Sequence, residues 1–485
     1  MLRHLASLSE MKRIFQMAET NFDLVVIGAG PGGYHAAIRG AQLGLSVAVV
    51  EKDDGTGIGG LGGVCLNWGC IPSKSLLKNA EVVNHLSHAD DWGIEVGEWS
   101  ASIAKAVDRS RKVSNALTNG IGFLFKKNKI TLVQGKATLK SSTQIDVEGG
   151  ETLTAKNIVI ATGARARSLP GLEIDGESII TSRHALELRE QPEAIAIIGA
   201  SAIGCEFAYY FNSYGVNVKM FEMLGHLVPR EDKDVSVELE RQFGQQGIEF
   251  AVSASVSGVE KKDARLAVQY EVNGEKDEFI CDKVLLGVGV QPNTDSIGLE
   301  NVGINTVDPG YIEVDGNMRT NVGGVYAVGD VNGKLMLAHV AFDQGVVAAE
   351  TIAGHNPEPI DDYVNMPRCT YAQPQIASIG LTEAQARDNG VNIKVGKVPF
   401  QVAGKSVAIS EPQGFVKVLI DDDSGEVIGA HIIGPEATEL IAEIGMLQML
   451  EGTNLELHKM THAHPTLSEA VKEAGAAVTN EAIHF

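Results

Sequence analysis

The order of apolar and polar positions near the N-terminus predicts a strand, a helix and a second strand. Residues 24–27 are consecutive apolar residues of the kind found in a buried strand. Gly28, Gly30 and Gly33 follow in the spacing G-x-G-x-x-G, and a helix and a second apolar strand that ends at Glu51 come after them. That spacing is weak by itself, but its strand–turn–helix setting and the acid about 20 residues later indicate a dinucleotide-binding βαβ unit.

The same pattern recurs 171 residues later, in residues 194–223. The identical positions are turn glycines, core residues and the terminal acid, which is Glu222 in the second segment. Two such units favour two bound dinucleotides over two βαβ units that bind nothing. A carboxylate accepts hydrogen bonds from a ribose 2′-hydroxyl and repels a 2′-phosphate. Glu222 therefore favours NAD over NADP, and Glu51 suits the adenosine ribose of FAD.

The second unit departs from the glycine pattern at one position. Gly199 and Gly204 match the first and third glycines, but Ser201 stands where the second glycine would be. A serine can adopt the required backbone if its φ is negative, although its side chain crowds the phosphates. We therefore still expect this unit to bind NAD.

Further along the chain, the pattern predicts a third glycine-containing strand and a terminal region of another type. Residues 157–171 read as a strand, an Ala-Thr-Gly turn and a Pro-Gly exit. Residues 320–345 read as a strand that ends in Gly-Asp and is followed by a helix. After Met366, strands at 414–421 and 427–434 precede a helix at 439–450, which predicts an α+β domain.

Composition excludes several classes of function. The formal net charge is −22, from 62 acidic and 40 basic residues, and no basic stripe offsets it, so we expect no nucleic-acid partner. No run of about 18 apolar residues occurs, so we expect no membrane span. Residues 1–16 are either an organelle-targeting segment or, as we favour, sequence upstream of a start at Met17. A cytoplasmic location follows from the second interpretation, and a mitochondrial or other organellar one from the first.

The segment GGVCLNWGCIPSK, residues 62–74, contains two of the five cysteines, Cys65 and Cys70. In a regular helix their Cα atoms would be roughly 8.7 Å apart, whereas a disulfide tolerates about 6.8 Å. Either the two never bond, or the helix is distorted, for which Asn67 and Gly69 are suited. A strained, easily reduced bond suits a catalytic disulfide, and Lys74, one helical turn past Cys70, would favour a thiolate. The other three cysteines are expected to be small buried hydrophobes: Cys205, Cys281 and Cys369.

Residues 62–74 resemble the redox-active site of the class I pyridine nucleotide-disulfide oxidoreductases, and the resemblance extends from about residue 21 to the end of the chain. Within that family the sequence is most similar to the dihydrolipoamide dehydrogenases. Glu222 fits NAD, no cysteine follows Cys369, and THAHPTLSEAVKEA at 461–474 resembles their C-terminal signature. Residues 336–339, Met-Leu-Ala-His, also resemble this branch of the family.

The resemblance implies roles for the thiols and for an ion pair. Cys65 would exchange with the substrate, and Cys70 would lie against the flavin as the charge-transfer thiolate. Lys74 would lie near the flavin N5 and pair with Glu206, which follows the second glycine motif.

The resemblance also implies a general base, His464, oriented by Glu469 and supplied by the neighbouring subunit of a homodimer. A histidine before a proline often only terminates a loop, and His462 has the same chemistry. The family pattern singles out His464 because it directly precedes Pro465. A carboxylate beside an imidazole fixes its tautomer and stabilises the imidazolium.

The cofactors implied are one tightly but non-covalently bound FAD per subunit and NAD+ as a substrate; no metal is expected. The residues implied for FAD are Gly28, Gly30, Gly33, Glu51, Lys74, Gly135, Thr162, Gly163, Gly329, Asp330 and Ala338, and those for NAD are Gly199, Ser201, Gly204, Glu222 and Gly289. Val290 lies where an arginine is commoner in the family, so one polar contact is expected to differ.

The expected fold is α/β, with two Rossmann-like domains and a C-terminal α+β dimerisation domain. The expected limits are 1–20 for an N-terminal extension, 21–167 for FAD binding, 168–290 for NAD binding, 291–365 for the FAD-binding continuation and 366–485 for dimerisation. The implied activity is oxidation of protein-bound dihydrolipoamide with NAD+, and the partner a lipoyl-bearing acyltransferase or a glycine-cleavage carrier protein. Two alternatives stay open: an NAD(P)H-dependent reductase of another small disulfide, and a low-turnover flavoprotein acting as a redox sensor or assembly component.

Overall fold

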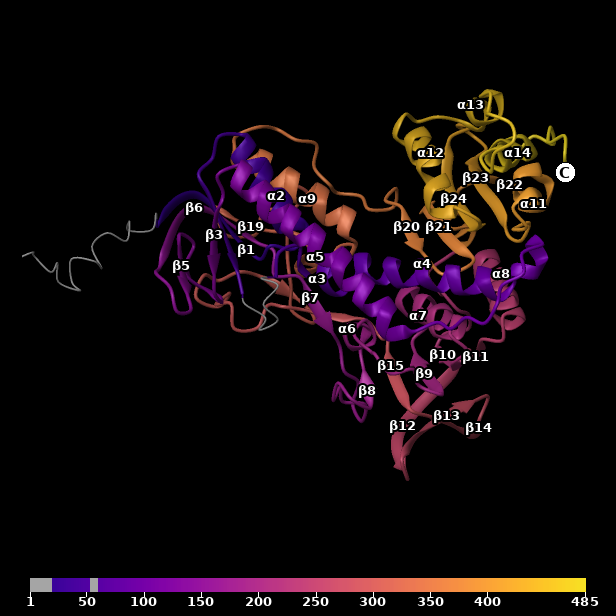
Figure 1. The fold of residues 1–485 in the computed structure, drawn as a ribbon. Coiled ribbons are helices and arrows are strands. Elements are labelled where there is room, and N and C mark those ends of the chain that lie inside the picture. Colours follow the sequence, from indigo (N-terminus) through magenta and orange to yellow (C-terminus); the bar gives the residue numbers. More distant parts are fainter. Residues whose placement is uncertain (1–19, 53–59) are drawn as a thin grey trace, which may run out of the picture. The chain divides into compact units, whose positions relative to one another are not determined.

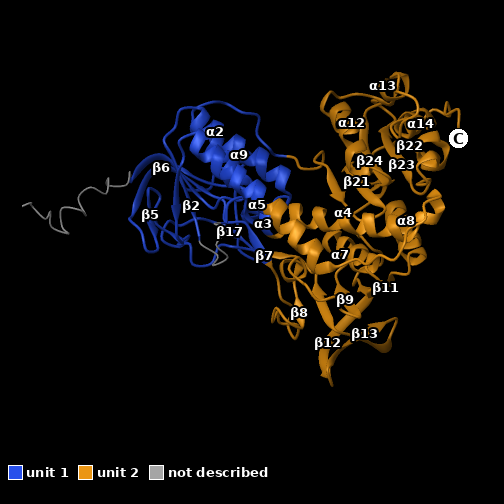
Figure 2. Ribbon diagram, in the orientation of Figure 1, with its two compact units in different colours: residues 1–67, 115–165, 291–361 blue, residues 68–114, 166–290, 362–485 orange. Residues whose placement is uncertain are grey.

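The chain forms two compact units in a computed structural model that describes residues 20–52 and 60–485. Figure 2 colours unit 1, the described residues of 1–67 with 115–165 and 291–361, and unit 2, residues 68–114, 166–290 and 362–485. Four of the five unit boundaries fall within α3 (Gly63–Trp68), α5 (Ile103–Lys127), β7 (Ala164–Ala166) and β16 (Val290–Pro292), and the fifth lies between residues 361 and 362. The interpretations of residues 1–16 lie outside the described residues, and the domain limits stay a prediction.

Unit 1 is built on a seven-stranded sheet, in which six strands have the order β3-β2-β1-β6-β5-β4 and the seventh, β19, pairs with β6. The central strand β1 pairs in parallel with β2 and with β6, and residues 24–26 in it are completely buried. Strands buried on both faces are continuously apolar, which is the pattern the sequence carries here. The strands of unit 1 are β1 (Asn21–Ile27), β2 (Val47–Glu51), β3 (Thr131–Gln134), β4 (Ala137–Ser141), β5 (Gln144–Val147), β6 (Leu153–Ile160), β17 (Thr306–Val307), β18 (Tyr311–Ile312) and β19 (Val325–Ala327).

Two helices of unit 1, α2 (Pro31–Gln42) and α9 (Ala338–Ile352), lie side by side, as Figure 1 shows. They approach so closely that a Cβ atom added at Gly345 would lie 2.4 Å from the carbonyl oxygen of Gly32. The Nε of Arg39 on α2 donates to Glu350 on α9 over 2.8 Å. The helix that begins at the glycine turn is therefore held by a helix more than 300 residues further along, and a short 3₁₀ turn, η2 (Gly329–Asn332), precedes that second helix.

Unit 2 contains the second predicted βαβ unit, in a five-stranded parallel sheet with the order β11-β10-β9-β15-β8. Every residue of β9 is buried, and the predicted strand–helix–strand succession is confirmed. A three-stranded antiparallel sheet, β12-β13-β14, adjoins it in the chain. The elements are β8 (Ile179–Ile180), α6 (Ser182–Ala185), β9 (Ala194–Ile198), α7 (Ala202–Ser213), β10 (Asn217–Phe221), α8 (Lys233–Gln245), β11 (Glu249–Ala251), β12 (Ala254–Lys262), β13 (Arg265–Val272), β14 (Glu275–Cys281) and β15 (Lys283–Leu286).

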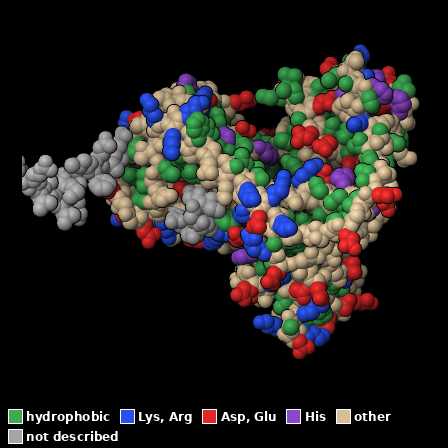
Figure 3. Space-filling view, viewed as in Figure 1, with side chains coloured by type: hydrophobic (Ala, Val, Ile, Leu, Met, Phe, Trp, Pro, Cys, Tyr) green, Lys and Arg blue, Asp and Glu red, His purple; other side chains and the backbone are tan. Residues whose placement is uncertain are grey.

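The C-terminal part of unit 2 is an antiparallel sheet, β20-β21-β24-β23-β22, with helices around it, which confirms the predicted α+β domain. Its elements are β20 (Arg368–Thr370), β21 (Gln375–Gly380), α10 (Glu383–Asp388), β22 (Ile393–Pro399), η3 (Phe400–Val402), α11 (Gly404–Ala408), β23 (Phe415–Asp421), β24 (Val427–Gly434), α12 (Ala437–Met449), α13 (Asn454–Lys459) and α14 (Glu469–Ala477). Unit 2 also contains helix α4 (Cys70–Ser87), η1 (Ala89–Trp92) and the first part of α5, up to residue 114. Acidic side chains are spread over the face shown in Figure 3 rather than gathered in one patch.

The contact between α2 and α9 predicts the effect of adding one methyl group. Gly345→Ala is expected to destabilise the protein by about 1–3 kcal/mol, because the new Cβ overlaps the Gly32 carbonyl. Gly120→Ala, in the exposed middle of α5 with nothing within 4 Å of the added Cβ, is the matched control. It should be neutral or stabilising by up to about 1 kcal/mol. Thermal unfolding of both variants measures the difference, and equal midpoints would contradict the assigned contact.

Candidate active site

The two cysteines of residues 62–74 lie in different helices. Cys65 is in α3, which ends at Trp68, and Cys70 is the first residue of α4. Gly69 separates them with φ −144° and ψ −117°, values far from helical ones. Of the two alternatives that the sequence left open, the structure contains the distortion, and it lies at Gly69. The Asn67 amide, which is buried, donates to the carbonyl oxygens of Leu61 (2.9 Å) and residue 63 (3.0 Å) and so fixes the turn before the break.

Lys74, on α4, forms the predicted ion pair with Glu206, on α7. Its Nζ lies 2.9 and 3.0 Å from the two carboxylate oxygens, and the Glu206 side chain is only 8% exposed. The backbone N–H of Tyr371 donates to the same carboxylate over 3.0 Å, and the Lys74 Nζ lies 4.3 Å from the centre of the Tyr371 ring. A carboxylate and an aromatic face therefore fix the ammonium group, a favourable pair of contacts for a cation. Sequence reasoning missed Tyr371, and no local pattern marks it.

His464 and Glu469 form the second predicted pair. The His464 Nδ1 lies 2.9 Å from Oε1 of Glu469, and the backbone N–H of Thr466 donates to Oε2 over 2.9 Å. The Thr466 bond, and then the His464 bond, lower the pKa of Glu469. A carboxylate at Nδ1 selects the tautomer with its proton there, which leaves the Nε2 lone pair as the acceptor. Because the His464 side chain is 78% exposed, that nitrogen can accept a proton from a molecule outside the chain.

The two neighbouring histidines have the same chemistry in the sequence but differ in burial. The His462 side chain is 3% exposed, and its Nε2 lies 2.7 Å from Oε1 of Glu443 on α12. The His462 ring is therefore packed inside the domain. Of the two, His464 has the accessible imidazole.

The glycines of the first turn are required by close backbone contacts. Gly28 has φ +102°, and a Cβ there would lie 2.4 Å from the carbonyl oxygen of Ala161. A Cβ at Gly33 would lie 1.9 Å from the carbonyl oxygen of Gly28, so α2 can start against the strand end only without a side chain there. The N–H of Ala29 donates to Oε2 of Glu51 over 2.6 Å, which anchors the acid beside the turn.

The second turn repeats this construction. A Cβ at Gly204 would lie 2.0 Å from the carbonyl oxygen of Gly199, and the N–H of Ala200 donates to Oε2 of Glu222 over 2.9 Å. Ser201 has φ −78° and ψ −173°, close to the −69° and −176° of its counterpart, Gly30. The expected negative φ is confirmed, so the serine keeps the backbone of the glycine it replaces.

The residues present in unit 1 fit FAD. Beside the first turn, Asp330 follows β19, and burial raises its pKa to about 6. No hydrogen bond from the described residues reaches that carboxylate, which leaves it able to accept one from the hydroxyls of a ribitol chain. Unit 1 also contains Cys65 and every residue expected to contact FAD except Lys74. Unit 2 contains Lys74, Cys70, the pairs described above and all the residues expected to contact NAD.

The remaining cysteines have no thiolate character. Cys205 and Cys281 are completely buried, as expected, whereas Cys369 is half-buried. Burial is the main cause of the raised pKa of all three thiols. The pKa of Cys281 and that of Cys369 rise to about 11, and the pKa of Cys205 is raised as well. These three thiols stay protonated at neutral pH and are poor nucleophiles.

Residues 22–345 match the family model of the pyridine nucleotide-disulphide oxidoreductases, and residues 366–475 match the dimerisation domain of the same family. The chain belongs to the pyridine nucleotide-disulphide oxidoreductase family. As in that family, its cofactors are FAD and NAD+. Within residues 20–52 and 60–485, no helix is long and apolar enough to cross a membrane. The same described residues contain no group of three or more His, Cys, Asp or Glu that could hold a metal ion.

Curated relatives of this oxidoreductase cover nearly the whole chain. It is 42% identical over 480 residues to the dihydrolipoyl dehydrogenase of Bacillus subtilis, with 96% of this chain and 100% of the relative covered. It is 44% identical over 479 residues to that of Rhizobium etli, with 94% and 98% covered. Among solved structures, LpdA from Mycobacterium tuberculosis has a TM-score of 0.86 at 28% identity, with 94% of this chain and 99% of that chain covered. The HOCl-induced flavoprotein disulfide reductase RclA from Escherichia coli has a TM-score of 0.83 at 25% identity, with 94% and 99% covered.

The geometry of the second turn predicts opposite results for two small substitutions. Gly204→Ala should weaken NADH binding by roughly tenfold or more, because the added Cβ overlaps the Gly199 carbonyl and moves the helix start away from the pyrophosphate. Ser201→Gly should bind NADH at least as tightly as the wild type, because the backbone is already glycine-like. Fluorescence titration with NADH measures both, and a weakened Ser201→Gly variant would show that the serine side chain itself holds the nucleotide.

Proposed function

We propose that this oxidoreductase is a dihydrolipoyl dehydrogenase, which oxidises protein-bound dihydrolipoamide and delivers the hydride to NAD+. Relatives of that name are 42–44% identical over nearly its full length. The observation in the structure that carries the proposal is the pair of His464 with Glu469, which presents an exposed, oriented base. A base of this kind is needed because only a thiolate attacks a disulfide efficiently.

The thiol half of the reaction uses protein side chains only: the cysteines of one subunit and the His464–Glu469 pair of the other. The Nε2 of His464 takes the proton from one thiol of dihydrolipoamide, and Glu469 stabilises the imidazolium. The new thiolate attacks Cys65 of a Cys65–Cys70 disulfide, which forms a mixed disulfide and releases Cys70 as a thiolate. The second lipoyl sulfur displaces Cys65 and closes the lipoamide disulfide, and its proton passes to the departing Cys65 sulfur. Two electrons therefore remain on the thiol pair.

The surroundings of Cys70 support its thiolate form. Cys70 begins an 18-residue helix, and a helix N-terminus stabilises negative charge. Lys74 lies one turn further on, with its ammonium fixed by Glu206. When bound, FAD carries the two electrons from the reduced thiol pair to NAD+.

The base is proposed to serve the thiols of a second subunit, in a homodimer. The family's dimerisation domain covers residues 366–475, and His464 lies within it with its side chain exposed. Large apolar side chains at the end of α12 are also exposed and offer a surface for a second copy: Met446, Met449 and Leu450. The partner outside the dimer is proposed to be a lipoyl-bearing acyltransferase or a glycine-cleavage carrier protein. The bacterial relatives and the acidic composition of this oxidoreductase support a cytoplasmic location.

The two histidines provide a matched pair of variants. His464→Gln should lower dihydrolipoamide oxidation by about 10²–10⁴-fold, because the thiol loses its general base. Reduction of a small acceptor dye by NADH should change far less, since that reaction needs no thiol proton transfer. His462→Gln is the control, expected to lower stability through the lost Glu443 contact while keeping most of the turnover. Equal loss of both activities in His464→Gln would contradict the assignment of His464 as the general base.

The function itself is tested on purified protein with a panel of substrates. A yellow protein that reduces NAD+ with dihydrolipoamide, and NADP+ much more slowly, is the expected result. Faster NADPH-driven reduction of another small disulfide would favour the reductase alternative. Bound flavin without appreciable turnover of dihydrolipoamide would favour the redox-sensor alternative.

A further inference from the structure

One polar side chain from each strand of the C-terminal sheet lies in a single row. The strand register places Arg368 opposite Ser378, Ser378 opposite His431, His431 opposite Lys417, and Lys417 opposite Lys397. Residues directly opposite one another in neighbouring strands point to the same face of a sheet. The row, residues 368, 378, 431, 417 and 397, therefore crosses all five strands on one face.

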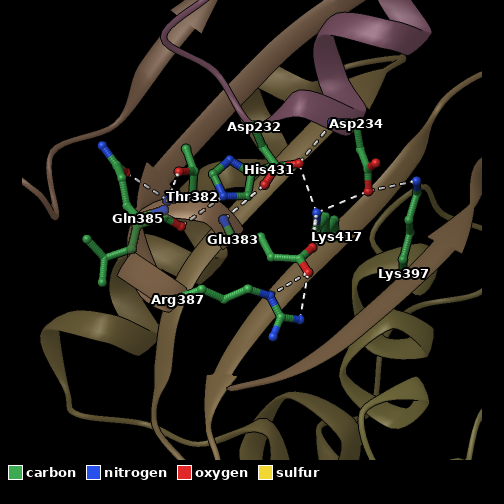
Figure 4. Close-up of polar contacts among 10 residues, drawn as sticks. Asp232, Asp234, Thr382, Glu383, Gln385, Arg387, Lys397, Lys417 and His431 are labelled. Carbon is green, nitrogen blue, oxygen red and sulfur yellow. Dashed lines mark hydrogen bonds and ion pairs between the residues drawn. The ribbon is translucent and has the colours of Figure 1, made fainter. Parts of the chain in front are cut away.

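Lys417, in this row, is buried in a cluster of carboxylates. Its side chain is only 2% exposed, and its Nζ lies 2.8 Å from Asp232, 3.0 Å from Asp234 and 2.7 Å from Glu383 (Figure 4). Burial lowers the pKa of the Lys417 ammonium, but hydrogen bonds to Asp232 and Glu383 outweigh that effect and raise it, so the group stays charged. The first two carboxylates come from the start of α8 in the NAD-binding part of unit 2, and the third from α10 in the C-terminal part.

Both ends of the row meet the same segment, residues 231–234. The Nζ of Lys397 lies 2.9 Å from Asp234. The Ser378 hydroxyl donates to Glu231, and the Nε of Arg368 lies 3.9 Å from that carboxylate. A four-residue stretch of the NAD-binding part is therefore held along the whole width of the C-terminal sheet.

Asp232 also joins two helices from the two parts. Its Oδ1 accepts the N–H of Asp234 at the start of α8 over 3.1 Å, and its Oδ2 accepts the N–H of Glu383 at the start of α10 over 3.0 Å. Buried ion pairs contribute little net stability compared with apolar packing, and their best attested use is to fix register. This cluster is well placed for such a use, because it joins helix starts that are about 150 residues apart in the chain.

The held segment, residues 231–234, is connected by hydrogen bonds to the second glycine turn, residues 199–204. Val228 has φ +42°, a conformation that a β-branched residue rarely adopts, and its N–H donates to the carbonyl oxygen of Ala200 over 2.9 Å. Ala200 lies between Gly199 and Ser201, and its own N–H is bonded to Glu222. The N–H of Glu231, in the held segment, donates to the carbonyl oxygen of Val228 over 2.9 Å. Such strain persists only where the surrounding structure imposes it, and the held segment, residues 231–234, begins three residues later.

We propose that Lys417 is a positioning residue for the nicotinamide nucleotide. By fixing Asp232 and Asp234 it holds residues 222–234, and through Val228 it sets the position of the Ala200 turn against Glu222. The proposal rests on the proposed function only in that the second turn binds NAD+. It assigns Lys417 an effect on nucleotide binding and none on the thiol chemistry.

The two half-reactions of the holoenzyme separate these effects. Lys417→Met removes the ammonium that Asp232 contacts, whereas Asp234 keeps Lys397 and Glu383 keeps Arg387. It should raise KM for NAD+ about tenfold with a much smaller change in kcat. The Kd for NADH, from fluorescence titration, should rise by a similar factor. Reduction of the enzyme by dihydrolipoamide without NAD+, followed by flavin absorbance, should keep its wild-type rate. Lys394→Met, on the same sheet but in an exposed ion pair with Asp422, is the control and should change neither.

A milder variant guards against failure to fold. Glu383→Gln removes one of the three carboxylates and should raise KM for NAD+ about two- to threefold in the same direction. Equal slowing of both half-reactions, or an unchanged Kd for NADH in a folded Lys417→Met variant, would overturn the positioning role. A wild-type protein that is not reduced by dihydrolipoamide but binds NADH would instead defeat the proposed function and leave the binding test of Lys417 valid.

Discussion

The dinucleotide sites depend on one steric constraint, the contact between a helix start and the strand end before it. At Gly33 and again at Gly204, a side-chain carbon would lie within about 2 Å of a backbone carbonyl oxygen. Only glycine lets the helix begin so close to the strand, and only that approach directs the first N–H groups of the helix toward a pyrophosphate. The acid that ends the next strand then bonds an N–H within the turn, so the two halves of each βαβ unit fix each other.

Backbone geometry also determines the surroundings of the two cysteines in residues 62–74. A continuous helix through residues 63–87 would separate the cysteines by more than a disulfide allows. Gly69 interrupts it and makes Cys70 the first residue of a new, 18-residue helix. The interruption therefore changes the electrostatics at Cys70, because this thiol lies at a helix N-terminus and not in a helix interior. Lys74 follows on the same helix, and its contacts with Glu206 and the Tyr371 ring keep the charge from turning into solvent.

Features that arise from neighbouring residues could be predicted from local rules, whereas contacts formed by packing could be predicted only where a family pattern marks their residues. The turn glycines, the acids and the backbone of Ser201 follow from local conformational rules, and each lies where it was expected. Lys74 with Glu206, and His464 with Glu469, were reached through family resemblance and are paired in the structure. Tyr371 is 165 residues from the carboxylate it bonds, and no periodicity or spacing marks it. The row across the C-terminal sheet is equally hidden, since strand register joins residues from five separate segments.

The two histidines show that the position of the glutamate partner, more than the residue type, decides which imidazole is accessible. His462 and His464 each have a glutamate within hydrogen-bond distance, so their pairs are chemically equivalent. Glu443 lies on α12, 19 residues before His462, and its contact holds the His462 ring against that helix, where the ring is buried. Glu469 begins α14, five residues after His464, and a pair closed within one short loop can stay at the surface. An imidazole held by a distant helix becomes part of the core, whereas one held by its own loop keeps an oriented, accessible nitrogen. Proton transfer to a substrate carried by another protein requires the second arrangement.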